Sequence, residues 1–148
     1  MRLNLSTQFS LRILLFAAAV KRKTTTREIA QFYGLPLDRV RKAARKLGRL
    51  GYLITERGQT GGLRLSKPAT EVALGPVIRQ LEGSSAASIE ARHDGLYRPL
   101  QEALHEAMAE AEARFWEKLD RVALAELVAK AELHGGATQA SPQGQRAA

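Results

Sequence analysis

The sequence contains no cysteine among its 148 residues. Thiolates are the ligands of iron–sulfur clusters and the nucleophiles of many enzymes, so functions that need them are excluded. The absence agrees with a reducing compartment. A chain of this length buries enough surface to fold without a disulfide or a structural metal, and no cofactor is predicted.

The sequence also lacks a long hydrophobic run. Its apolar stretch over residues 11–20 is interrupted by Arg12 and is shorter than the ~18 residues that a membrane span needs. Lys21, Arg22 and Lys23 follow it, which is not the pattern of a secretory signal. We therefore expect a cytoplasmic protein with no membrane partner.

Catalytic motifs are missing as well. There is no Walker or dinucleotide fingerprint, and the glycine-rich residues 58–62 lack the lysine and the following helix that a nucleotide loop requires. His93, near Asp94 and Glu90, is interpreted as surface rather than as a metal ligand. We expect neither an enzyme nor a metal site.

Acidic residues are scarce in the first half of the chain. Residues 1–68 hold 15 Lys and Arg against 3 Asp and Glu, a balance of +12, whereas residues 69–148 have a balance of −4. A concentrated positive charge favours a polyanionic partner, because binding phosphates releases counterions. The alternative is a solvated basic surface without a partner.

Local signals predict two helices before the most basic segment. Apolar residues at helical spacing indicate a first helix over residues 6–20. Thr25 stands three residues before Glu28, the spacing of a capping box. A second helix over residues 26–33 should follow and end at Gly34.

A third helix is expected from Pro36, because proline is tolerated where a helix begins. Its apolar residues recur at helical spacing and define one buried face. That face consists of Leu37, Val40, Ala44 and Leu47. The opposite face is strongly cationic. Its charged residues are Asp38, Arg39, Arg41, Lys42, Arg45, Lys46 and Arg49.

A β-hairpin is predicted after the three helices, with strands in 52–57 and 63–65 and a glycine-rich turn between them. A short fourth helix over residues 74–81 should end at Gly83. This order of elements predicts a mainly α fold with a small β-hairpin: a winged helix-turn-helix over residues 1–82.

The C-terminal part is expected to form a dimer. Residues 83–95 should form a connecting loop. Residues 96–133 should hold a long dimerisation helix, from Pro99 to about Val122, followed by a C-terminal helical turn. Residues 134–148 should be a disordered tail. Apolar residues repeat along the long helix almost as in a coiled coil, and we interpret Trp116 as part of the same packing. The repeat consists of Leu104, Met108, Ala111, Phe115, Leu119 and Val122.

In a winged helix-turn-helix the recognition helix enters the major groove of DNA. Base contacts are expected from Arg39, Arg41 and Lys42, with Asp38 accepting from cytosine, and phosphate contacts from Arg45, Lys46 and Arg49. The N-terminus of the second helix should add backbone contacts through Thr25, Thr26 and Arg27. The hairpin should add others through Arg57, Gly61, Gly62 and Arg64.

One family resemblance is specific. Three segments carry it: REIAQFYGLPLDRVRKAARKLGRLGYLITERGQTGGLRLSKP, then LGPVIRQLEG and FWEKLDRVALAEL. Over about residues 1–128 the chain resembles the bacterial winged-helix regulators typified by NsrR and IscR. The resemblance implies a homodimer, joined by the long helix, that binds palindromic operator DNA. Members that sense redox state or nitric oxide hold an iron–sulfur cluster through three cysteines in the loop before that helix.

This sequence departs from the family in two places. Residues 84–88, SSAAS, stand where the cysteines are expected, so the cluster is not carried over. Pro36 stands where serine is common near the start of the recognition helix. The chain is either from a cysteine-free branch or one whose cysteines were replaced. Its signal is then a small molecule near the 83–95 loop, a protein partner, or none.

The function predicted is therefore a dimeric, sequence-specific transcriptional regulator, a repressor that recognises a palindromic operator in double-stranded DNA. The alternative is a winged-helix protein-interaction scaffold without specific DNA recognition. The two differ in whether a palindrome is preferred over random duplex.

Overall fold

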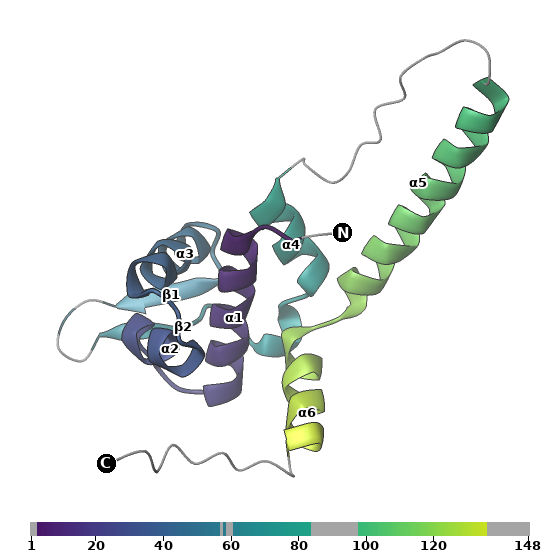
Figure 1. Ribbon diagram of the computed structural model, residues 1–148. Helices are drawn as coiled ribbons and strands as arrows, with labels where there is room; N and C mark the ends of the chain where they lie inside the picture. Colours follow the sequence, from purple (N-terminus) through teal and green to yellow (C-terminus); the bar gives the residue numbers. More distant parts are fainter. Residues whose placement is uncertain (1–2, 57, 59–60, 84–97, 136–148) are drawn as a thin grey trace, which may run out of the picture.

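The computed structural model describes residues 3–56, 58, 61–83 and 98–135 of the chain. The described residues form six α-helices, a two-stranded sheet and one 3-10 turn over Ala69–Glu71. Figure 1 shows their arrangement. In chain order the helices and strands are α1 (Leu5–Val20), α2 (Thr26–Tyr33), α3 (Leu37–Arg49), β1 (Leu53–Glu56), β2 (Gly62–Leu65), α4 (Leu74–Glu82), α5 (Arg98–Arg121) and α6 (Leu124–Gly135).

The first helices begin and end where the local sequence predicts. The Asn4 side chain accepts a hydrogen bond from the Thr7 amide and caps α1. The Thr25 hydroxyl accepts from the Glu28 amide at 3.1 Å and caps α2, which ends at Gly34. Side-chain acceptors at these positions satisfy amides that have no partner within the helix.

The hairpin is attached to the chain segment that precedes α2. Strands β1 and β2 pair antiparallel, with Leu53 opposite Leu65. Thr24 forms an isolated bridge with Leu63: the Thr24 amide donates to the Leu63 carbonyl at 3.0 Å, and the Leu63 amide donates to the Thr24 carbonyl at 2.7 Å. A Cβ on Gly62 would lie 2.8 Å from the Thr24 carbonyl oxygen, so glycine is required for this close approach. The base of the wing and the start of α2 are therefore held together.

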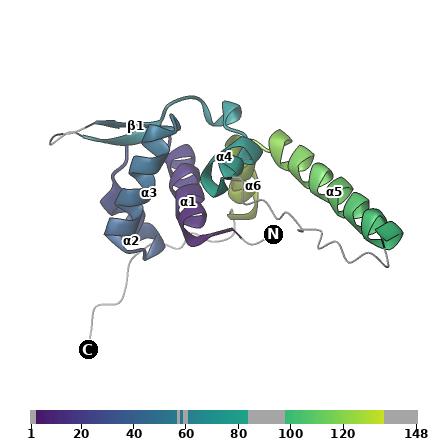
Figure 2. The same ribbon diagram turned by 90° about the horizontal axis from the view of Figure 1, so that it is seen from above.

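A single hydrophobic core lies around α1, which runs between α3 on one side and α4 and α6 on the other (Figures 1 and 2). Ile13 and Leu14 of α1, Ile29 of α2 and Leu47 of α3 are fully buried. The apolar residues of α3 face this core, as their spacing predicts. Burial of such side chains is the main stabilising contribution to the fold.

Helix α6 contributes to the same core. Leu124 is fully buried and Val128 nearly so, in one cluster with residues of α1 and α3. Their position was not foreseen from the sequence, which grouped residues 124–133 with the dimerisation helix. We use "N-terminal lobe" for α1–α4, the hairpin and α6 together.

Helix α5 extends away from the N-terminal lobe, as both ribbon views show (Figures 1 and 2). None of its 24 residues is buried. Its C-terminal end lies beside α4, and its N-terminal end is far from the lobe. Within the described ranges, no helix is both long enough and apolar enough to span a membrane.

Candidate nucleic-acid interface

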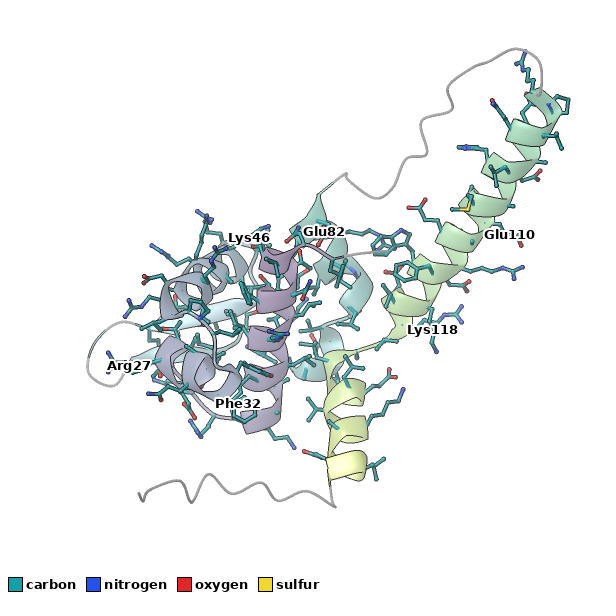
Figure 3. The ribbon with its side chains drawn as sticks, in the orientation of Figure 1. Arg27, Phe32, Lys46, Glu82, Glu110 and Lys118 are labelled. Atoms are coloured by element: carbon teal, nitrogen blue, oxygen red, sulfur yellow. The ribbon has the colours of Figure 1, made fainter. Side chains whose placement is uncertain are left out.

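The outer face of α3 presents a row of cations. Val40, Ala43, Ala44 and Leu47 are buried on the inner face, and the charged residues therefore project outward. Figure 3 shows nitrogen-tipped side chains extending outward from α3. The exposed cations of the row are Arg39, Arg41, Lys42, Arg45 and Arg49.

Most of these cations lack a protein partner. Within the part of the chain that the structure describes, four side chains of the row make no hydrogen bond or ion pair: Arg39, Lys42, Arg45 and Arg49. The same holds for Arg27 of α2. Arg41 has a partner: its Nη1 lies 3.4 Å from Oδ1 of Asp38, whose side chain is 95% exposed. Cations without carboxylate neighbours produce a positive potential that attracts polyanions.

Lys46 differs from the rest of the row. Its side chain is half-buried, and its Nζ donates a 2.9 Å hydrogen bond to the main-chain carbonyl of Leu81, near the end of α4. Lys46 and Glu82 lie at the same end of the lobe (Figure 3). The sequence placed Lys46 among the phosphate contacts, but its ammonium group already has a partner within the protein.

The N-terminus of α2 carries an ion-pair cluster that the sequence did not indicate in full. The Glu28 carboxylate accepts hydrogen bonds from Arg22 and from the Thr24 hydroxyl. The bond from Arg22, followed by that from Thr24, lowers the pKa of Glu28 to about 2. Glu28 therefore holds Arg22 beside the start of α2. The 21–23 basic run was the signal for this cation, but its partner was not evident.

Arg27 and the two threonines at this helix end have different surroundings. Arg27 is exposed and lies at the outer edge of the lobe, on the side of the hairpin (Figure 3). The Thr25 hydroxyl already serves as the helix cap, and Thr26 is half-buried. Between α2 and α3 a shallow pocket of about 410 Å³ opens next to Arg27.

The wing carries charges of both signs. Arg64 of β2 is exposed, and Gly61 and Gly62 are half-buried at the start of that strand. Lys23 forms an ion pair with Glu56 at the end of β1, and this contact lowers the pKa of Glu56. Arg57, which the sequence assigned to the same surface, lies outside the described residues.

The apolar stripe expected on α5 is present and uncovered. Leu100, Leu104, Met108 and Phe115 are 67%, 58%, 47% and 40% exposed, and Ala111 is exposed too. Leu119 and Val122, nearer to α4, are half-buried. The 83–95 loop lies outside the described residues except for Gly83. The SSAAS segment and the effector position expected beside the loop therefore lie outside them too.

A basic recognition helix beside a small wing defines a winged-helix, DNA-binding transcriptional regulator. Sequence comparison agrees: the model of the family Rrf2, described as an iron-dependent transcriptional regulator, matches residues 3–130. The chain belongs to the Rrf2 family.

Solved structures show the same fold. The structure of CymR, the global cysteine regulator of B. subtilis, has a TM-score of 0.67 and 22% identity, over 88% of this chain and 98% of that one. IscR of T. potens has a TM-score of 0.71 and 19% identity, over 97% and 94% of the two chains. CymR of Staphylococcus aureus has a TM-score of 0.65 and 26% identity, over 84% and 96%.

The iron in the family's description does not fit this chain's residues. Iron–sulfur clusters are held mainly by cysteine thiolates, and the sequence has no cysteine. In the described ranges, no group of three or more His, Asp or Glu residues is placed to hold a metal ion. The fold and the DNA-binding class carry over from the family, whereas a thiolate-held cluster does not.

Proposed function

We propose that two copies of the chain pair through α5 and bind a palindromic operator, each copy placing α3 in the major groove. The observation that carries this proposal is the row of five exposed cations on α3, four of which have no acidic partner among the described residues. Arg39, Arg41 and Lys42 would face bases, and Arg45, Arg49 and Arg27 would face phosphates.

The wing and the start of α2 are proposed to contact the DNA backbone. Arg64 and the backbone at Gly61 and Gly62 approach the groove beside α3, with Arg57 in the same loop. Thr25 and Thr26 offer main-chain and hydroxyl groups to a phosphate. Lys46 is left out of this set, because its ammonium group is bonded to the Leu81 carbonyl.

The exposed stripe of α5 supports the dimer. A helix of 24 residues with a row of large apolar side chains in water is stabilised when a second copy covers that row. A two-fold dimer presents two recognition helices related by symmetry, and this arrangement matches an operator whose half-sites are palindromic.

Repression is proposed as the outcome, because a dimer bound across an operator excludes other proteins from that DNA. This takes place in the cytoplasm, where the operator DNA is. The input is either a small molecule near the 83–95 loop or a protein partner that binds there.

The test is selection of duplex DNA from a random pool, followed by binding measured at two salt concentrations and by native mass spectrometry. We expect a palindromic consensus, a dimer mass, and an affinity that falls steeply with salt. Equal binding to the selected palindrome and to random duplex would overturn the proposal and favour the protein-interaction scaffold.

A further inference from the structure

One side chain of α4, that of Arg79, contacts two residues of α5. Arg79 donates two hydrogen bonds to Asp120, from Nη1 to Oδ1 and from Nη2 to Oδ2, both at 2.7 Å. A bidentate pair of this kind restricts orientation as well as distance. The same guanidinium group lies over the ring of Trp116, 4.5 Å from its centroid. Trp116, expected in the dimer interface, thus contacts the lobe.

The backbones of the two helices also meet closely at this point. A Cβ on Gly75 of α4 would lie 1.9 Å from Oδ1 of Asp120 and 2.9 Å from its amide nitrogen. No other residue would permit this approach without displacing Asp120. Ala73 and Ala123 form an isolated antiparallel bridge just beyond. We call Gly75, Arg79, Trp116 and Asp120 the α4–α5 joint.

The other end of α4 is attached to the rest of the lobe. Lys46 of α3 donates to the carbonyl of Leu81. Asn4 donates its amide and its side-chain nitrogen to the Glu82 carboxylate, each at 3.0 Å. Helix α4 therefore connects the recognition helix on one side with the dimerisation helix on the other.

A small change of angle at this joint produces a large displacement at the far end of α5. At 1.5 Å per residue α5 is about 36 Å long, and none of its residues is buried. A change of roughly 10° at the joint would move the far end of such a helix by about 6 Å. This is larger than the ~3.4 Å between neighbouring nucleotides along a DNA strand. When two α5 helices are paired, the same change would instead move the two recognition helices relative to each other.

We propose that Arg79 and Asp120 are positioning residues: they fix the angle between the N-terminal lobe and α5, and thereby select the spacing between the two half-sites of the operator. The inference rests on the proposed dimeric operator binding. It assigns spacing selectivity to residues that do not touch DNA, whereas α3 reads the sequence of each half-site.

The experiment uses the full chain and the palindrome selected from the random pool. Duplexes are made with the half-site spacing unchanged, shortened and lengthened by one and two base pairs, together with a duplex that carries one half-site. Affinities are measured for the wild type, Arg79→Gln, Asp120→Asn and Arg79→Lys. The control is Glu117→Gln, which removes an ion pair with Arg121 that lies within α5 and does not reach α4.

We expect the wild type and Glu117→Gln to prefer one spacing by roughly tenfold or more, the order of effect seen when DNA must be deformed to fit. Arg79→Gln and Asp120→Asn should lose most of this preference, while affinity for the single half-site and the dimer mass stay unchanged. Arg79→Lys should also lose it, because lysine keeps the charge but cannot form the bidentate pair.

Spacing preferences that are the same in Asp120→Asn and the wild type would overturn the inference. So would a parallel loss of single half-site affinity, because it would show that the joint only maintains the folded lobe. A wild type that binds its palindrome equally at every spacing would also overturn it and leave the proposed function standing. A wild type without any sequence preference would instead overturn the proposed function.

Discussion

Lys46, on the recognition helix, donates a hydrogen bond to the carbonyl of Leu81, 35 residues further along the chain. This bond satisfies one of the carbonyls that a helix leaves unpaired at its C-terminus. It also makes Lys46 different from the exposed cations near it in the sequence, because its ammonium group already has a partner within the protein. Two lysines four residues apart, Lys42 and Lys46, are therefore expected to respond differently to substitution.

Lys46→Met should lower the free energy of unfolding by about 1 kcal/mol, the net value of a typical hydrogen bond. The slope of operator affinity against salt concentration should stay as in the wild type. Lys42→Met should leave stability unchanged and weaken operator binding by about 1–3 kcal/mol, because Lys42 is proposed to face a base. Denaturant unfolding and salt titrations check both variants. A reduced salt slope in Lys46→Met would show that this lysine contacts phosphate after all.

Arg41→Ala and Lys42→Ala should each weaken operator binding by about 1–3 kcal/mol, the range for a side chain that reads a base edge. The dimer mass should not change. Lys118→Ala is the matched control, because it removes an exposed cation from α5 rather than from α3 (Figure 3). Normal operator affinity in both α3 variants would mean that a different surface reads the DNA.

Gly62→Ala should disturb the attachment of the wing. Its Cβ would lie 2.8 Å from the Thr24 carbonyl oxygen, so the bridge between Thr24 and Leu63 must shift. We expect a loss of about 1–3 kcal/mol in the free energy of unfolding, as for other overpacked sites. Gly48→Ala is the control. Gly48 lies within α3, and a Cβ there would make an ordinary 3.8 Å contact with the carbonyl oxygen of Leu53 in β1, so alanine should stabilise the helix by about 0.5–1 kcal/mol. Equal effects of the two substitutions would contradict the packing argument.

Glu28 should make stability dependent on acidic pH. Its pKa is about 2 in the folded protein and about 4.3 in an unfolded chain. Its stabilising effect is therefore complete above about pH 5 and is lost as the pH falls towards 2. The difference in free energy of unfolding between wild type and Glu28→Gln should narrow as the pH falls from about 5 to 2. Glu71→Gln, whose exposed carboxylate has no partner in the described residues, should show no such change.

Met108→Glu should convert the dimer to monomers at micromolar concentration, because it places a charge in the middle of the exposed stripe of α5. Glu110→Ala changes a residue on the opposite side of the same helix and should leave the dimer intact. Sedimentation or native mass spectrometry distinguishes the two. A dimer that persists in Met108→Glu would place the contact between copies elsewhere.

Local signals in the sequence were sufficient to predict helices α1 to α4 and the positive charge of α3. Thr25 and Gly34 bound α2 because capping depends on atoms within four residues along the chain. The cationic face of α3 follows from helical periodicity, which is local in the same sense. The absence of cysteine excludes a thiolate-held cluster from the sequence alone.

Which of these side chains pair with a residue far along the chain was evident only from the folded structure. Lys46 and Leu81 are 35 residues apart, Arg79 and Asp120 are 41 apart, and the burial of Leu124 depends on α6 returning to α1. Periodicity places a residue on a face of its own helix, but it does not specify which other element packs against that face. The division between cations that stay exposed and cations that join helices therefore arises from packing over long separations in the chain.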